Sequence, residues 1–170
     1  CNSIKGDIDC LNILDFEGDG DLDLFFIERS ISNNSLTSST KSFLFINHEN
    51  KFINKNNELS VIDGIKTIQD AIWSDMDNNG YQDLILIESF GAIKIYKNKN
   101  GKLEASSKTN QLSKHQGYWK CLDVVDLNSD GFLDIVATNM GNNNVVSTEN
   151  SETQIVFVET NDGKSGVPFT

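Results

Sequence analysis

The stretch D-L-N-S-D-G-F-L-D occupies residues 126–134 and runs directly into the apolar segment I-V-A-T. The same pattern occurs twice before it, as D-F-E-G-D-G-D-L-D at residues 15–23 and D-M-D-N-N-G-Y-Q-D at residues 75–83. Each copy has an oxygen-bearing side chain at positions 1, 3, 5 and 9 and Gly at position 6, and apolar segments flank each copy. Three copies with one spacing predict a repeat protein that carries an equivalent loop in every unit.

The side chains of these loops are suited to a hard cation. Ca²⁺ takes about six to eight oxygen ligands at roughly 2.3–2.6 Å and tolerates irregular geometry, whereas Mg²⁺ requires a stricter octahedron. The Gly at position 6 permits the left-handed backbone that turns the chain back toward an ion. We therefore expect about three Ca²⁺ sites, in which position 7 contributes only its backbone carbonyl. The expected ligands are Asp15, Glu17, Asp19, Asp21 and Asp23, then Asp75, Asp77, Asn79, Tyr81 and Asp83, and finally Asp126, Asn128, Asp130, Phe132 and Asp134.

Two other structures share part of the loop pattern. An EF-hand shares the first half of the spacing but needs an acidic ligand at position 12. Position 12 is Phe26, Leu86 and Ala137 in the three copies, which excludes the EF-hand. Asp, Asn and Gly also dominate ordinary turns, but matching spacing and matching flanks in three copies favour a metal site.

Composition limits the classes of function. The 170 residues contain 38% hydrophobic residues and a formal net charge of −11, and eleven of the 25 acidic residues lie in the three loops. A nucleic-acid partner would need a basic surface and is not expected. No apolar run is long enough to span a membrane. Cys10 and Cys121 occupy equivalent positions in separate units, so we expect buried free thiols, with a Cys1–Cys10 bridge as the open alternative.

The segments around the loops predict short strands. C-L-N-I-L-D-F, A-I-W-S-D-M and C-L-D-V-V-D-L precede the loops, and D-L-F-F-I, D-L-I-L-I and D-I-V-A-T follow them. Further strands are predicted from Lys41, Gly91 and Gln154, with hairpin turns at His48 and Lys99. Ser30–Thr40 is rich in Ser and Asn and is expected to be a surface loop. Four short strands in about 50 residues match the size of a propeller blade.

The loops and their flanks resemble FG-GAP/VCBS-type repeats, the calcium-binding blades that also occur in α-integrin heads. The segment G-Y-W-K-C-L-D-V-V-D-L-N-S-D-G-F-L-D-I-V-A-T-N-M-G-N-N-N from Gly117 is similar to bacterial proteins that carry such repeats before an ASPIC/UnbV segment. The resemblance covers about residues 7–145. It implies an all-β propeller fold with Ca²⁺ on the loop between the first two strands of each blade, and it implies no catalytic residue. Asn79 stands where many copies have Asp.

The expected architecture is a single β-propeller-type domain over residues 1–170, with four-stranded antiparallel blades at about 7–60, 66–113 and 117–160 and part of another. Propellers close with about four to eight blades, and closure removes exposed strand edges. Three blades leave two open edges. We favour a piece of a larger propeller, with self-association of copies through the open edges as the alternative.

The expected function is a non-catalytic, calcium-binding scaffold or adhesion module, extracellular or on the cell surface and of bacterial origin, that binds a protein or a glycan. Trp73, Tyr118 and Trp119 are candidate glycan contacts, although aromatic residues beside a strand are more often core residues. One alternative is a structural subunit of a self-assembling surface layer or filament. Another is a fragment of a calcium-dependent polysaccharide-active enzyme, for which His115 is a better candidate base than His48.

Overall fold

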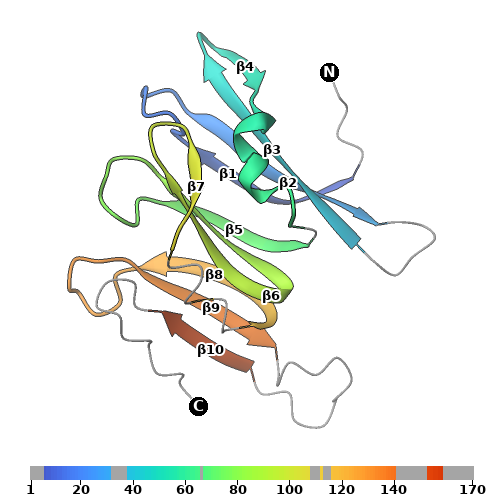
Figure 1. The fold of residues 1–170 in the computed structure, drawn as a ribbon, viewed down its shortest axis with the longest axis vertical. Helices are drawn as coiled ribbons and strands as arrows, with labels where there is room; N and C mark the ends of the chain where they lie inside the picture. The colour runs from blue at the N-terminus through green and yellow to red at the C-terminus, as the bar shows by residue number, and fades with distance from the viewer. Residues whose placement is uncertain are drawn as a thin grey trace.

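The computed structural model describes residues 6–31, 38–65, 67–107, 112, 116–140 and 153–158, which form antiparallel sheets and one short 3₁₀ helix (Figure 1). The first part of the chain contains β1 (Asp7–Leu14), β2 (Asp23–Ile31), β3 (Ser38–His48), β4 (Lys51–Asn54) and η1 (Asn56–Ile62). The second contains β5 (Ile68–Ser74), β6 (Asp83–Asn98) and β7 (Leu103–Ala105), and the third contains β8 (Gln116–Val125), β9 (Asp134–Met140) and β10 (Thr153–Val158). The predicted all-β class is confirmed.

Blade 1 is the sheet β1-β2-β3-β4, in which every strand pairs antiparallel with the next one along the chain. The predicted turn after His48 connects β3 to β4, and its two residues, Glu49 and Asn50, both have positive φ. β2 and β3 continue to pair through Ser30↔Ser39 and Ile31↔Ser38. The prediction of a loop over Ser30–Thr40 is therefore wrong at both ends, because polar Ser and Thr side chains do not prevent hairpin pairing at a solvated edge.

Blade 2 is built from β5, β6 and β7. A straight strand of 16 residues would be about 50 Å long, yet the backbone N–H of Asn98 donates to Asp83 Oδ1 at 2.8 Å, from one end of β6 to the other. β6 therefore folds back on itself near Phe90, which has a φ of 58°. Its two arms supply the second and third strands of a four-stranded blade, as the sequence predicted.

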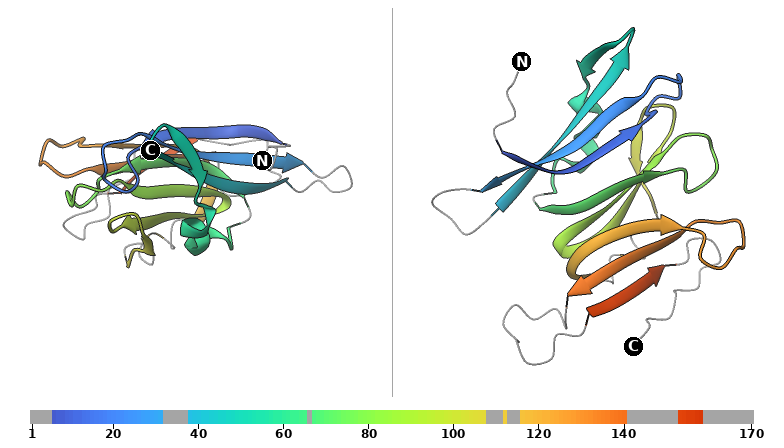
Figure 2. Two further views of the ribbon diagram at one scale, coloured as in Figure 1. Left: turned by 90° about the horizontal axis from the view of Figure 1, so that it is seen from above. Right: turned by 180° about the vertical axis from the view of Figure 1, so that it is seen from behind.

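Blade 3 contains β8, β9 and β10 in antiparallel order. The predicted strand from Gln154 is confirmed by β10. The start of β8 also pairs with the turn of β6 over residues 89–92, which makes the sheets of blades 2 and 3 continuous at that edge. The first strands of the blades are neighbours, since β1 contacts β5 and β5 contacts β8 (Figure 2).

The core lies between the blades. Alternate residues of a strand point to opposite faces of its sheet, so blade 2 contributes one set of side chains to the contact with blade 1 and the other set to the contact with blade 3. Between blades 1 and 2, Trp73 packs edge to face against Phe16 and Phe25, with ring centroids 5.8 and 5.2 Å apart. Between blades 2 and 3, Ile85, Ile87 and Trp119 are buried together.

The 3₁₀ helix η1 was not predicted. Leu59 and Ile62 are its buried residues and join the core between blades 1 and 2. Their spacing of three residues matches the period of a 3₁₀ helix, which places both side chains on one side. A pair of apolar residues in a polar segment is too weak a signal to distinguish this helix from a turn.

Candidate metal centres

Each acidic loop connects the first two strands of its blade. Residues 15–22 join β1 to β2, residues 75–82 join β5 to β6, and residues 126–133 join β8 to β9. The three loops lie on the same side of the molecule, at the left in Figure 1. The strand positions predicted from the sequence therefore place three chemically similar loops along one edge of the row of blades.

The carboxylate at position 1 organises each loop. Asp75 accepts the N–H of Asn79 at 3.0 Å and the N–H of Gly80 at 2.8 Å. Asp15 and Asp126 accept the equivalent N–H groups of positions 5 and 6 at 2.9–3.2 Å. Gly at position 6 has a φ of 87–92° in the three copies, which a residue with a Cβ rarely adopts. The chain therefore curls around the first carboxylate in the same way in all three blades.

The side chain at position 5 has a second role that is common to the loops. Asp19, Asn79 and Asp130 each accept, through Oδ1, the backbone N–H of position 7 at 2.8–2.9 Å. Position 7 itself is Asp21, Tyr81 or Phe132. In each case the backbone N–H of position 7, and not its side chain, forms the shared hydrogen bond. This agrees with the prediction that position 7 needs no particular side chain.

The carboxylate at position 9 is buried and joins the loop to the sheet. Asp23, Asp83 and Asp134 are at most 4% exposed. Each accepts the N–H of position 2, from Phe16, Met76 and Leu127, at 2.8–3.3 Å. In blades 1 and 2 the same carboxylate also accepts a third-strand N–H, from Asn47 and Asn98, both at 2.8 Å. Loss of this side chain would leave the N–H of position 2 without its acceptor in every blade, and the third-strand N–H in blades 1 and 2.

Burial makes the negative charge at position 9 costly. The pKa of Asp83 is raised to about 6, chiefly by desolvation; the N–H of Asn98 opposes the rise, and repulsion by Asp77 adds to it. The pKa of Asp23 is also raised, chiefly by burial. A bound cation would favour the ionised form of both groups and would offset the cost of burying them.

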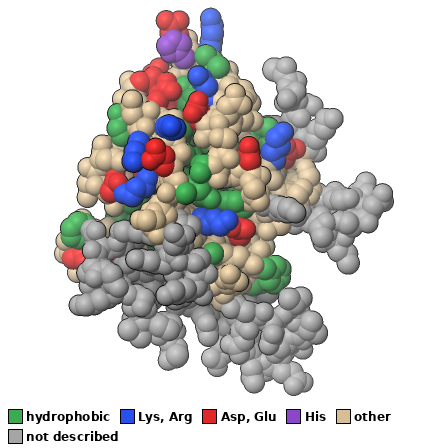
Figure 3. All heavy atoms as spheres, in the orientation of Figure 1, with side chains coloured by type: hydrophobic (Ala, Val, Ile, Leu, Met, Phe, Trp, Pro, Cys, Tyr) green, Lys and Arg blue, Asp and Glu red, His purple; other side chains and the backbone are tan. Residues whose placement is uncertain are grey.

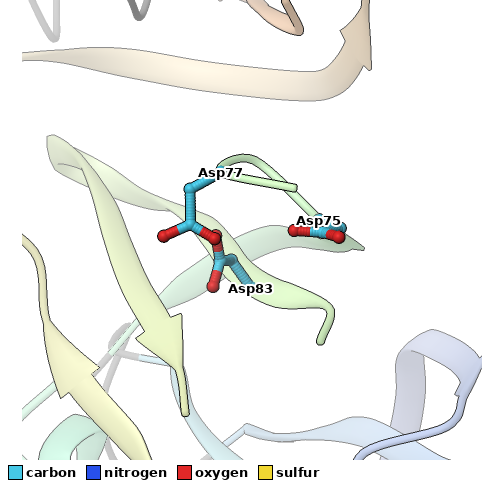
Figure 4. Close-up of side chains that lie close together, drawn as sticks. All are labelled: Asp75, Asp77 and Asp83. Atoms are coloured by element: carbon cyan, nitrogen blue, oxygen red, sulfur yellow. The ribbon is translucent and has the colours of Figure 1, made fainter. Parts of the chain in front are cut away.

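The second loop brings three carboxylates together. One oxygen from each of Asp75, Asp77 and Asp83 lies within 4.8 Å of the others (Figure 4). Lys97 on β6 forms an ion pair with Asp77. A lysine ammonium thus occupies part of the acidic site and would compete with a metal ion for this carboxylate.

The donor set fits Ca²⁺. Carboxylate and amide oxygens are hard ligands, and the accepted N–H bonds leave lone pairs on the same oxygens for a cation. In the second loop, Asp75, Asp77, Asn79 and Asp83 would hold the ion with the Tyr81 carbonyl. The equivalent residues of the first and third loops, predicted above, lie on the corresponding turns. Among the described residues, only the second loop forms a tight group of three acids.

Sequence reasoning missed three residues that matter here. Lys97 pairs with Asp77, and Gln82 Oε1 accepts the N–H of Asp15 at 3.3 Å, which links loop 2 to loop 1. Asn98, which is fully buried, donates its side-chain N–H to the Phe16 carbonyl of loop 1 at 2.8 Å. Asn47 and Asn98 lie 24 and 15 residues after the second-strand Asp of their units, so no shared spacing in the sequence marks them as equivalent.

The aromatic and histidine residues predicted as candidate contacts or bases lie in different environments. Trp73 and Trp119 are core residues. Tyr118 is half-buried and stacks on the exposed ring of Phe90, with centroids 4.5 Å apart, and Lys120 lies over its ring. His48 is exposed at the end of β3, and His115 lies outside the described residues.

The two cysteines that are described carry free thiols. Cys10 is half-buried, but Cys121 is exposed, so the prediction that Cys121 is buried is wrong.

On the face drawn in Figure 3, Lys and Arg side chains alternate with Asp and Glu side chains and form no basic patch. In the part of the chain that the structure describes, no helix is long and apolar enough to cross a membrane.

Comparison with protein families identifies an FG-GAP-like repeat over residues 75–137. The match begins at the first residue of loop 2 and ends in β9, so it includes two of the three loops. The match confirms the predicted resemblance to FG-GAP-type repeats. No curated protein matches the chain.

Proposed function

We propose, from the FG-GAP-like repeat and the three equivalent loops, that this chain is a non-catalytic, calcium-binding scaffold for extracellular protein or glycan contacts. FG-GAP repeats form propeller-type modules that are typical of extracellular proteins. One observation carries the proposal: each blade buries a position 9 carboxylate at the base of an acidic loop, where a divalent cation would neutralise it.

In this proposal Ca²⁺ fastens the turn between the first two strands of each blade. The loop side chains supply the oxygens, and the position 9 carboxylate connects the ion to the second and third strands. Ca²⁺ near millimolar concentration outside cells suits sites of modest affinity. The result is a rigid row of blades whose outer surfaces are presented to a partner.

The surface offers one described aromatic feature that suits such a contact. Phe90 and Tyr118 stack at the junction of blades 2 and 3, beside Lys120. Aromatic faces pack on the apolar faces of sugars and on protein side chains. We expect this pair to take part in partner contact.

The chemistry of the acids favours binding over catalysis. The carboxylates of the loops are engaged with backbone N–H groups, and no nucleophile motif such as G-x-S-x-G occurs in the sequence. The enzyme alternative makes a separate prediction, which is turnover of an acidic polysaccharide that is lost in His115→Ala. Such turnover would replace the proposal of a scaffold.

Isothermal titration calorimetry of the metal-free protein tests the proposal. We expect about three Ca²⁺ ions per chain, and one fewer after Asp75→Ala, with weaker binding of Mg²⁺. Asp63→Ala, an exposed acid in the segment after η1, is the matched control and should leave the stoichiometry unchanged. Absence of Ca²⁺ binding at millimolar concentration would contradict the proposal.

A further inference from the structure

The outer face of blade 1, on the side away from blade 2, is apolar and exposed. Large hydrophobic side chains that are at least half exposed gather in this blade: Ile8, Leu11, Ile13, Leu22 and Phe52. Leu11 pairs across the strands with Phe26, which stacks on Phe43 with centroids 5.0 Å apart. We call this surface the leading face.

The repeat register shows what normally covers such a face. Counting from the first Asp of each loop, Leu11 and Ile13 of blade 1 correspond to Ala71 and Trp73 of blade 2. Leu11 and Ile13 are 59% and 62% exposed, whereas Ala71 and Trp73 are 4% and 7% exposed because blade 1 covers them. Ile8 corresponds in the same way to the buried Ile68. Phe52 pairs with Asn47 as the buried Leu103 pairs with Asn98, so strand pairing makes these two residues equivalent. The leading face of blade 1 is therefore one half of a blade-to-blade interface.

A polar residue beside this face points to the same conclusion. In blade 2, the Asn98 side chain donates to the Phe16 carbonyl, which belongs to the loop of the preceding blade. Asn47 holds the equivalent place in blade 1, since its N–H also donates to the position 9 carboxylate. Its amide oxygen is buried without a hydrogen-bond partner, whereas Asn98 Oδ1 accepts the Gly101 N–H of its own blade. By the same register, the side-chain N–H of Asn47 would face the loop of a blade that packs on the leading face.

Blade 3, at the opposite end of the row of blades, exposes the other half of such a blade-to-blade interface. Val125 and Leu127 of blade 3 are 39% and 51% exposed, and they correspond to Leu14 and Phe16, which are buried against blade 2. Cys121 is also exposed there. We call the surface formed by Cys121, Val125 and Leu127 the trailing face.

The two existing interfaces also fix which residues should meet. Five residues before each loop, Cys10 Sγ contacts the Ala71 carbonyl of the next blade at 3.4 Å, and Asp70 accepts the Leu122 N–H of the next blade at 3.0 Å. Cys121 is the third residue at this position. By continuity it would contact the residue equivalent to Ala71 and Leu122, which in blade 1 is Leu11.

We propose that the leading face of one copy binds the trailing face of a second copy, head to tail, so that the row of blades continues from one molecule to the next. Both halves of the interface are present on this chain, and their register is set by the interfaces between blades 1, 2 and 3. Two copies supply six blades, within the range of about four to eight in which propellers close. A closed pair is the expected product. The contact lies between blade faces and differs from pairing between strand edges.

Solution mass is the first test, and it uses the whole chain. Size-exclusion chromatography with light scattering should give twice the chain mass of 18.9 kDa, with calcium and with chelator. Leu11→Arg should give the single-chain mass with an unchanged circular dichroism spectrum, because this side chain is already exposed. Val61→Arg, an exposed apolar residue on η1, is the control and should leave the pair intact.

Thiol cross-linking tests the register. In a Cys1→Ser background, Leu11→Cys should be joined to Cys121 of a second copy by a short bis-maleimide, and Cys121→Ser should abolish the product. A single-chain mass at all concentrations would overturn the proposal and would assign the leading face to a different chain or segment. A pair that survives Leu11→Arg, or a cross-link that survives Cys121→Ser, would overturn the proposed contact. None of these outcomes depends on calcium binding, which calorimetry on the Leu11→Arg variant measures separately.

Discussion

Within a loop, acidic residues of the same type form different hydrogen bonds. Asp19 at position 5 accepts the N–H of Asp21 through Oδ1, whereas Asp21 enters this hydrogen bond through its backbone N–H. Position 9 carries a buried carboxylate in every copy, while position 7 accepts Asp, Tyr or Phe. The number of acids in a loop therefore overstates the number of side chains that would hold an ion.

The first prediction separates positions 5 and 7. Asp19→Ala should weaken Ca²⁺ binding to loop 1 by about tenfold or more, since it removes a charged ligand, about 1.4 kcal/mol. Asp21→Ala should change the affinity by less than about threefold, because the backbone carbonyl remains. Calorimetric titration of both variants measures this difference, and equal effects would contradict the ligand assignment.

The second prediction concerns the lysine at loop 2. Lys97→Gln should strengthen Ca²⁺ binding to this loop by roughly fivefold, since a competing cation near the site costs about 1 kcal/mol at a distance of 4 Å in water. Lys94→Gln is the matched control, because Lys94 pairs with Glu88 and not with a loop acid. Titrations at low and high salt should show that the gain from Lys97→Gln shrinks as salt screens the charge. Weaker binding in Lys97→Gln would show that Lys97 supports the site.

The third prediction uses a carboxylate outside the loops. Burial raises the pKa of Asp70, the N–H bonds from Leu122 and Ala71 lower it, and repulsion by Asp123 raises it again. The folded state therefore disfavours the ionised form. The stability that Asp70 contributes is fully present below its unfolded pKa near 3.8 and is lost as pH rises through the raised value in the folded protein.

Asp70→Asn removes this titration and keeps an acceptor for the Leu122 N–H. The free energy of unfolding of Asp70→Asn, measured with urea in the presence of chelator, should increase relative to that of the unmodified protein between pH 4 and pH 7. Asp63→Asn, on an exposed residue, should show no such trend. A constant difference between Asp70→Asn and the unmodified protein at both pH values would refute the assignment.

At the level of elements, each blade is joined to the next by the same two kinds of contact. The apolar faces pack, and polar groups from the first and third strands reach the neighbouring loop or strand. Asn98 belongs to β6 but donates to Phe16 in the loop between β1 and β2, and its Oδ1 accepts the Gly101 N–H at 2.9 Å. The equivalent Asn47 on β3 has no such partner for its amide oxygen.

The fourth prediction compares these two asparagines. Asn98→Ala should destabilise the chain by about 2–4 kcal/mol, because it leaves two backbone groups at the interface without a partner. Asn47→Ala should cost less than about 1 kcal/mol in the Leu11→Arg background, where copies are separated. Denaturant unfolding of the two variants measures the difference. Equal costs would contradict the inter-blade role of Asn98.

At the level of the whole molecule, three loops lie along one edge and two cores lie between three blades. Each blade buries one apolar face only when a neighbour covers it, so the stability of a blade depends on the blades beside it. Ions bound by the folded state alone add to this stability by mass action. The formal charge of −11 means that three divalent cations would also relieve much of the repulsion in the folded chain.

The fifth prediction follows from this linkage. Raising Ca²⁺ to 100 times the dissociation constant should stabilise the protein by about 2.7 kcal/mol for each site, and chelator should lower the melting temperature accordingly. Mg²⁺ at the same concentration should give a smaller shift. Differential scanning calorimetry measures the effect, and an unchanged melting temperature would contradict calcium binding by the folded state.

The sequence by itself determined the strands, the loops and their shared chemistry. Spacing such as that of Asp126, Asn128, Asp130 and Asp134 is local, because adjacent residues in one turn fix which oxygens converge and where Gly must stand. Short aliphatic and aromatic runs next to the loops, such as D-L-I-L-I, likewise predicted the all-β class. Polar composition alone misled at Ser30 and Ser39, where hairpin pairing outweighs composition.

Only the tertiary structure decided which groups meet across blades. Asn98 on the Phe16 carbonyl and the exposure of Cys121 depend on how one blade is placed against the next, and Lys97 meets Asp77 because β6 folds back beside loop 2 within blade 2. The tertiary structure also distinguished core aromatics such as Trp73 from the surface pair of Phe90 and Tyr118. The physical reason is that these contacts join residues distant in the chain, whose approach is set by the packing of whole sheets and not by the spacing within any one segment.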